Sequence, residues 1–149
     1  MGYTTNKQYQ KSVLNAYTNT SQTLAANQAI AFNNINVLNG CSIDFTAGTT
    51  SVELQKPGVY LVTVDSSVAE SGTAGVITMQ LQNNGVNVNG AVSNIDSTAA
   101  GDINGMSFST VIKVLPSCCA VNNTVTLTVL NTGVGAVYSN ANITIIKLC

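Results

Sequence analysis

The sequence contains no histidine, no arginine and no tryptophan. Histidine is the usual general base and a common metal ligand, so its absence excludes His-based triads and dyads and the common zinc enzymes. Arginine is the usual reader of phosphates and base edges, and the five lysines stand against six carboxylates, for a net charge of −1. We therefore predict neither enzymatic activity nor binding to nucleic acid.

Charged residues of either sign are scarce. They make up 7% of the chain, against about 25% in an ordinary soluble domain, although 45% of the residues are hydrophobic. Nineteen Asn and eighteen Thr supply the missing polarity. Asn and Gly favour turns while Thr and Val favour strands, so this composition predicts a β protein with a neutral surface. Such surfaces suit proteins that pack against their own copies or lie outside cells.

Long apolar segments are also missing. The first eight residues hold no signal-peptide core, and the apolar stretch 143–148 is interrupted by Thr144 and Lys147, well short of the ~20 residues that span a bilayer. We expect no membrane partner and an outside-facing protein without an export signal. Release by host lysis, as for a virion, would explain this, and so would deposition on a spore or a leader absent from this sequence.

The length of 149 residues indicates one domain. Residues 1–22 are polar and lack a convincing period, so we expect an N-terminal arm, followed by a β domain over 23–149. The arm is either flexible or ordered by docking on a neighbouring protein. Tyr3, Tyr9 and Tyr17 are its candidate docking residues.

From residue 23 the hydrophobic period is two. Residues 51–55, 59–65 and 76–82 alternate apolar and polar side chains, separated by turn-forming residues. Asn84-Gly85 between two alternating runs is a strong hairpin signal. The pattern predicts an all-β protein of about ten short strands, arranged as a sandwich or barrel.

The four cysteines are Cys41, Cys118, Cys119 and Cys149. Their spacing fits no zinc motif, and no histidine can activate one as a nucleophile. If successive strands alternate in direction, all four converge on one end of the sandwich. Convergence permits disulfides within or between subunits, a bound metal, or reduced thiols. We predict at least one disulfide in the mature assembly.

The remaining candidate ligands are Asp96 and Asp102, which flank an expected loop. Oxygen ligands suit calcium, but solvation of a loop explains the same two residues. We assign no metal and no cofactor to the chain.

The stretch Lys56-Pro57-Gly58-Val59-Tyr60-Leu61-Val62-Thr63-Val64 resembles a strand of the tumour necrosis factor and complement globular-head jelly-roll family. Residues 16–148 are also similar to the C-terminal domain of the Bacillus exosporium collagen-like glycoprotein and to small phage- and prophage-encoded proteins of the same fold. Ala31-Phe32-Asn33, the segment 80–90 and the closing strand 141–147 carry that similarity in order. No Gly-X-Y run precedes the domain, unlike in the exosporium protein.

The resemblance implies a ten-stranded jelly roll that assembles as a homotrimer. It also implies that Tyr60 and Tyr138 face the three-fold axis, whereas burial in the core is the alternative for Tyr60. We therefore expect a structural protein on the surface of a phage particle, a capsid decoration protein or fibre head, anchored to the capsid or another particle-surface protein by residues 1–22. The alternatives are a disulfide-linked subunit of a Gram-positive spore surface or appendage, and a carbohydrate-binding module.

Overall fold

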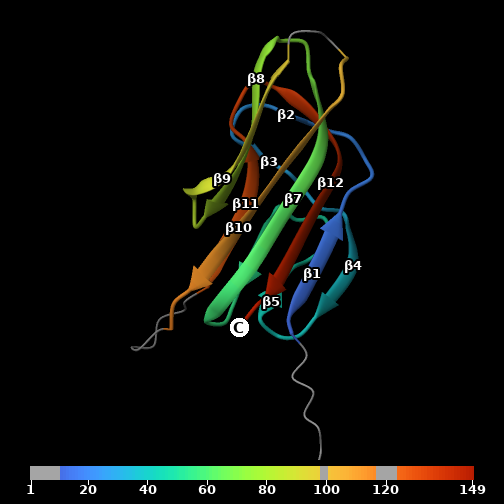
Figure 1. Cartoon of the computed structure of the whole chain (residues 1–149). Coiled ribbons are helices and arrows are strands. Elements are labelled where there is room, and N and C mark those ends of the chain that lie inside the picture. Colours follow the sequence, from blue (N-terminus) through green and yellow to red (C-terminus); the bar gives the residue numbers. More distant parts are fainter. Residues whose placement is uncertain (1–10, 98–100, 117–123) are drawn as a thin grey trace, which may run out of the picture.

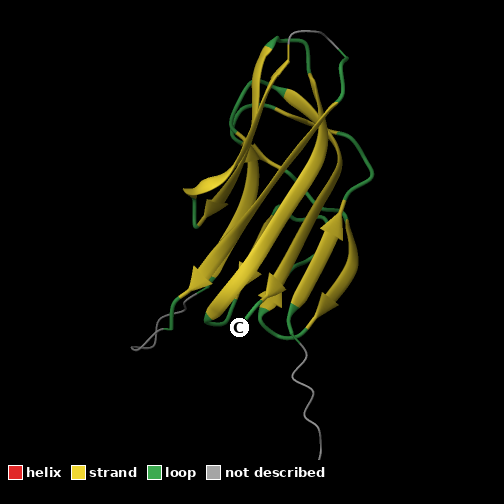
Figure 2. Cartoon of the chain, in the orientation of Figure 1, coloured by secondary structure: helices red, strands yellow, loops and turns green. Residues whose placement is uncertain are grey.

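The computed structural model of the chain describes residues 11–97, 101–116 and 124–149. These residues form twelve strands and no helix (Figure 2). In chain order the first six strands are short: β1 (Val13–Tyr17), β2 (Gln22–Leu24), β3 (Gln28–Ala29), β4 (Asn34–Asn39), β5 (Ile43–Asp44) and β6 (Ser51–Leu54). The last six are longer: β7 (Gly58–Glu70), β8 (Gly75–Asn83), β9 (Val86–Ser97), β10 (Asn104–Val114), β11 (Val125–Asn131) and β12 (Ala136–Lys147).

The strands form two antiparallel sheets that pack face to face (Figure 1). Sheet I has the order β10-β7-β12-β1-β4, and β2 pairs with the far end of β12. Sheet II has the order β5-β6-β11-β8-β9, and β3 pairs with β11. Most neighbours in each sheet are distant in sequence, so the fold depends on long-range pairing. No described residue belongs to a helix that is long and apolar enough to cross a membrane.

The core lies between the sheets because alternate side chains of each strand point inward. On β7, for example, Tyr60, Val62 and Val64 have 0% exposure, and the residues between them face away from sheet II. Sheet II contributes Ile77, Met79 and Leu81 in the same way. The predicted period of two is thus the signature of a sandwich with one buried face per sheet.

The predicted hairpin is confirmed at Asn84-Gly85, which joins β8 to β9. Both residues have positive φ, 50° and 81°, as a tight two-residue turn requires. The side-chain carbonyl of Asn84 also accepts a hydrogen bond from the backbone of Thr126, at 2.8 Å. The turn is therefore tied to β11 as well as to its own strands.

The boundary expected at residue 22 is wrong. Residues 13–17, which we assigned to the arm, form β1 inside sheet I, where Leu14 pairs with Ile145 of β12 on one side and with Leu38 of β4 on the other. Leu14 and Ala16 are fully buried, so this segment belongs to the core. Residues 1–10, with Tyr3 and Tyr9, lie outside the described residues.

Candidate interaction surfaces

The outer face of sheet I carries an aligned row of apolar side chains. Val13 on β1 lies opposite Ile146 on β12, which lies opposite Leu61 on β7, which lies opposite Val111 on β10. Val111 is 55% exposed and the other three are partly exposed. We call these four residues the apolar row. An exposed, contiguous apolar strip of this kind is typical of a surface that another protein covers.

Both edges of sheet I also carry exposed apolar side chains. At one edge all six residues of β4 are exposed. Val37, 39% exposed, lies opposite Asn15 on the outer face, whereas Ile35 and Leu38 lie opposite the inward-facing Ala16 and Leu14. At the other edge Val111 of β10 adjoins a groove of about 480 Å³ that is also lined by Val86 and Val88 of β9. Val86 is 69% exposed. Apolar side chains therefore lie at both edges of sheet I, and at the β10 edge residues of β9 from sheet II adjoin them.

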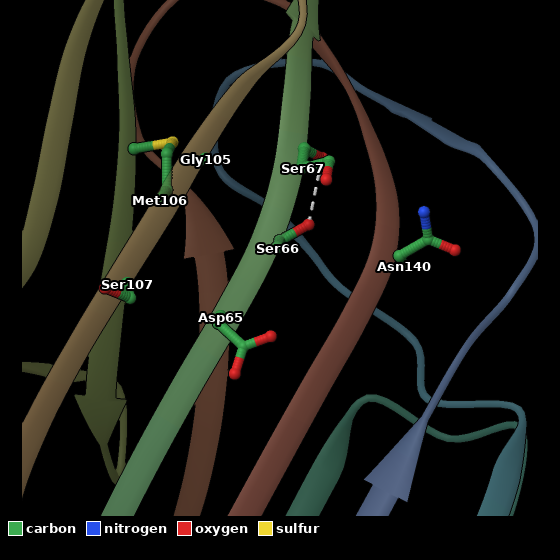
Figure 3. Close-up of a pocket in the computed structure, with 7 residues that line it drawn as sticks. All are labelled: Asp65, Ser66, Ser67, Gly105, Met106, Ser107 and Asn140. Carbon is green, nitrogen blue, oxygen red and sulfur yellow. Dashed lines mark hydrogen bonds between the residues drawn. The ribbon is translucent and has the colours of Figure 1, made fainter.

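Toward the other end of the sandwich, the outer face of sheet I becomes polar. A shallow hollow of about 500 Å³ is lined there by residues of β7, β10 and β12 (Figure 3). In Figure 3, Asp65 and Asn140 project from neighbouring strands, and a dashed line marks the bond that Ser66 Oγ donates to the carbonyl of Ser67, at 3.1 Å. Burial raises the pKa of Asp65 above its ordinary value of 3.8. One carboxylate beside serines and an asparagine provides no general acid–base pair.

Tyr60 and Tyr138 are core residues, so their predicted place at the trimer axis is wrong. Both have 0% exposure within the single chain, and a side chain covered by its own chain offers no surface to another. The hydroxyl of Tyr60 donates to the carbonyl of Lys56, at 2.6 Å. The hydroxyl of Tyr138 donates to Asn131 Oδ1, at 3.1 Å. Burial raises the pKa of both phenols.

Tyr17, the third candidate for arm docking, lies in β1. It pairs with Asn142 of β12 and Asn34 of β4 and is partly exposed on the outer face of sheet I. It therefore belongs to the same face as the apolar row, not to a free arm.

Cys41 and Cys149 meet at one end of the sandwich, as strand alternation predicted. Both line a pocket of about 310 Å³, and both are exposed free thiols. Lys11, the first described residue, lines the same pocket, so the chain enters at this end. We call the end that carries this pocket the base end; it is the lower end in Figure 1, where the C-terminus is marked.

Cys118 and Cys119 lie outside the described residues. The strands on either side of them reach the base end, because β10 finishes with Val114 opposite Gly58 and β11 begins with Val125 opposite Leu54. The backbone of Val59, next to Gly58, bonds to the carbonyl of Cys149, at 3.1 Å. Whether any pair of cysteines forms a disulfide remains a prediction.

Asp96 and Asp102 are both exposed, and residues 98–100 between them are outside the described part of the chain. Among the described residues, no three His, Cys, Asp or Glu side chains come together in a way that could hold a metal ion. The expectation that the chain uses no metal rests on the sequence argument alone.

The two sheets give the chain a jelly-roll fold that is similar to the fold of tumour necrosis factor-like proteins. No protein-family model and no curated protein matches the sequence. Solved structures do match: the Eiger tumour necrosis factor of S. frugiperda has a TM-score of 0.70 at 15% identity, over 93% of both chains. The globular domain of a zebrafish complement 1qA protein has a TM-score of 0.67 at 14% identity, over 93% of this chain and 98% of that one.

A vertex protein has the same fold. The PRD1 vertex protein P5 matches with a TM-score of 0.56 at 17% identity, over 93% of this chain and 97% of that chain. At such identities the likeness establishes the fold and nothing finer. The predicted all-β jelly roll of this type is confirmed, with twelve strands among the described residues instead of about ten. Three of them, β2, β3 and β5, are only two or three residues long.

Proposed function

We propose that the chain is a non-enzymatic structural protein that assembles as a homotrimer. The observation that carries this proposal is the apolar row on the outer face of sheet I, together with the apolar residues at both edges of that sheet. Burial of this surface against other copies would contribute about 25 cal/mol per Å² of apolar area. With so few charges on the chain, little electrostatic repulsion opposes the approach of identical copies.

The placement of the two edges favours a ring over a two-fold dimer. A two-fold contact in which one of these edges packs on its own copy would leave the other edge exposed. If the edge carrying Val111 and Val86 packs against the face beside β4 of the next copy, both edges are covered and the ring closes. Three copies are the number that the resemblance to the tumour necrosis factor and complement family implies.

We further propose that the trimer is displayed on the outside of a phage particle, as a capsid decoration protein or a fibre head. The shared fold with a vertex protein, the neutral surface and the chain entry at the base end support this placement. The base end would face the particle and residues 1–10 would provide the anchor. Three modest attachments at one symmetric site then bind together more tightly than any one of them.

The placement is tested by immunogold electron microscopy, with an antibody against the chain, on virions and spores from the strain that encodes it. Label on virions is the expected result, and absence of label from virions contradicts the placement. The anchor is tested with a chain lacking residues 1–10, which should remain a trimer but fail to join the particle. Removal of residues 1–22 would be uninformative, because it deletes β1 from the core.

Exposed Cys41 and Cys149 favour one alternative, a spore-surface or appendage subunit whose copies are linked by disulfides. Label on spores or appendages, with polymers that dissolve in reductant, would support that alternative. A non-reducing gel that shows only monomer, with four titratable thiols in denaturant, would contradict any disulfide.

A further inference from the structure

The base end concentrates the positive charge of an otherwise neutral molecule. Three of the five lysines in the sequence, Lys11, Lys56 and Lys147, line its pocket. No Asp or Glu side chain lines this pocket, so its three ammonium groups face at most one negative group, the α-carboxylate of Cys149, the last residue of the sequence. Clefts in which one sign of charge predominates attract ligands of the opposite sign.

Two of these ammonium groups are held in place by their neighbours. Lys147 Nζ donates to Ser42 Oγ, at 3.3 Å, and lies 5.9 Å from the centre of the Tyr60 ring. Lys56 Nζ donates to Cys41 Sγ, at 3.2 Å. An ammonium has three donors, so each group keeps further N–H donors for a ligand after these contacts. Ser42 and Tyr60 are themselves buried, so the support beneath Lys147 is part of the folded core.

We propose that the base-end pocket binds a carboxylate side chain of an acidic peptide segment on the surface that the trimer decorates. This inference deepens the proposed function and rests on it in one respect, that the base end faces the particle. Charge complementarity provides the attraction. It would also orient the molecule during approach. Because the lysines gather at the base-end pocket, an acidic surface would attract that end of the molecule first.

The composition of the pocket favours a carboxylate over a phosphate. Phosphate sites commonly use the flat fork of arginine or a series of backbone N–H groups, and this chain has no arginine. The pocket also has an apolar wall, Leu148, which is 43% exposed. The carbon stem of a glutamate can pack on such a wall, whereas a bare phosphate gains nothing from it.

The test titrates the full-length chain with a triglutamate peptide at low salt and follows backbone amide signals by nuclear magnetic resonance. We expect shifts at Ser12, Ser42 and Lys147, with affinity that falls as salt is added because exposed charges are screened. The variant Lys56→Gln/Lys147→Gln should lose about two- to fivefold in affinity for each lysine removed. The matched control is Lys113→Gln, which removes the same charge from β10, outside this pocket, and should keep the affinity of the unmodified chain.

Inorganic phosphate is titrated in parallel. Stronger binding of phosphate than of the peptide would overturn the carboxylate assignment, and a control variant that weakens peptide binding as much as the double variant would overturn the site. The mass of the double variant, measured by light scattering, distinguishes failure of the proposed pocket from failure of the proposed homotrimer. A trimer that binds particles but not peptide contradicts only the pocket, whereas a monomeric unmodified chain contradicts the proposed function.

Discussion

The outer faces of the two sheets differ in what they present at comparable positions. Across sheet I the aligned residues are the apolar row, Val13, Ile146, Leu61 and Val111. Across sheet II one aligned row reads Ser51, Thr128 and Gln82. The inner side chains of both sheets are buried in the core, so folding of the single chain does not explain why one outer row is apolar and the other polar. The contrast between these two rows supports the proposal that the apolar row of sheet I is covered by other copies of the chain.

The largest effect is expected from a charge placed in the apolar row. Leu61→Lys puts an ammonium in the middle of the proposed interface, and an unpaired charge buried there costs about 3–5 kcal/mol. We expect this variant to be a folded monomer by light scattering and circular dichroism. The matched control is Thr128→Lys on the outer face of sheet II, which should remain a trimer. Equal behaviour of the two variants would remove the distinction between the faces.

A smaller effect is expected at the edges of sheet I. Val111→Glu and Val37→Lys should each weaken the trimer, because each introduces a charge where an apolar contact is proposed. Combined in one chain they should recover part of the loss, about 1 kcal/mol, because the glutamate of one copy meets the lysine of the next. If each edge instead packed on its own copy across a two-fold axis, like charges would meet and the double variant would be the weakest. Sedimentation equilibrium distinguishes the two outcomes.

The buried tyrosines should affect stability without affecting assembly. Tyr138→Phe leaves the buried Asn131 Oδ1 without the donor it now has and should lower the free energy of unfolding by about 1–3 kcal/mol. Tyr17→Phe is the control, since no hydrogen bond of the Tyr17 hydroxyl is found within the described residues, and should change it by less than about 0.5 kcal/mol. Both are measured by urea unfolding of the trimer. Dissociation caused by Tyr138→Phe alone would restore that tyrosine to the interface.

The smallest effect concerns Asp65 on the outer face of sheet I. Burial raises its pKa in the folded chain, so the folded state binds the proton more tightly than the unfolded state. Stability from this group is therefore present below the unfolded pKa of 3.8 and is lost as pH rises through the higher folded pKa. Asp65→Asn should melt slightly higher than the unmodified chain at pH 7 and at the same temperature near pH 3. Asp102→Asn, at another exposed position, controls for the loss of one negative charge. A lower melting temperature for Asp65→Asn at pH 7 would contradict the upward direction of the Asp65 pKa shift.

Local signals in the sequence predicted the parts of the fold that local chemistry determines. Asn84-Gly85 predicted its hairpin because only a few residue types adopt positive φ without strain. Strand alternation placed Cys41 and Cys149 at one end, since each tight connection reverses the chain. The alternation of β7 likewise showed two faces, but it did not show which face the second sheet covers. The family resemblance implies that Tyr60 faces an interface, and its burial between the sheets corrects that expectation.

Features that depend on distant partners were not predictable in the same way. β1 is five residues long, and its inward residues are only Leu14 and Ala16. It is held in sheet I by β12, far along the chain, including bonds from Asn15 Nδ2 to Asn142 Oδ1 and Thr144 Oγ1, both at 2.9 Å. The sequence of residues 1–22 alone does not predict pairing with those partners. The cationic pocket was missed for the same reason, because Lys11, Lys56 and Lys147 are far apart in sequence.

The mass of the purified chain in solution, by light scattering with and without reductant, tests the central claim most directly. A homotrimer held by sheet I should have about three times the chain mass of 15.4 kDa in both conditions. A monomer at micromolar concentration would contradict it, since the apolar row would then be exposed in the free protein. A trimer that falls apart in reductant would place the association on the cysteines instead of sheet I.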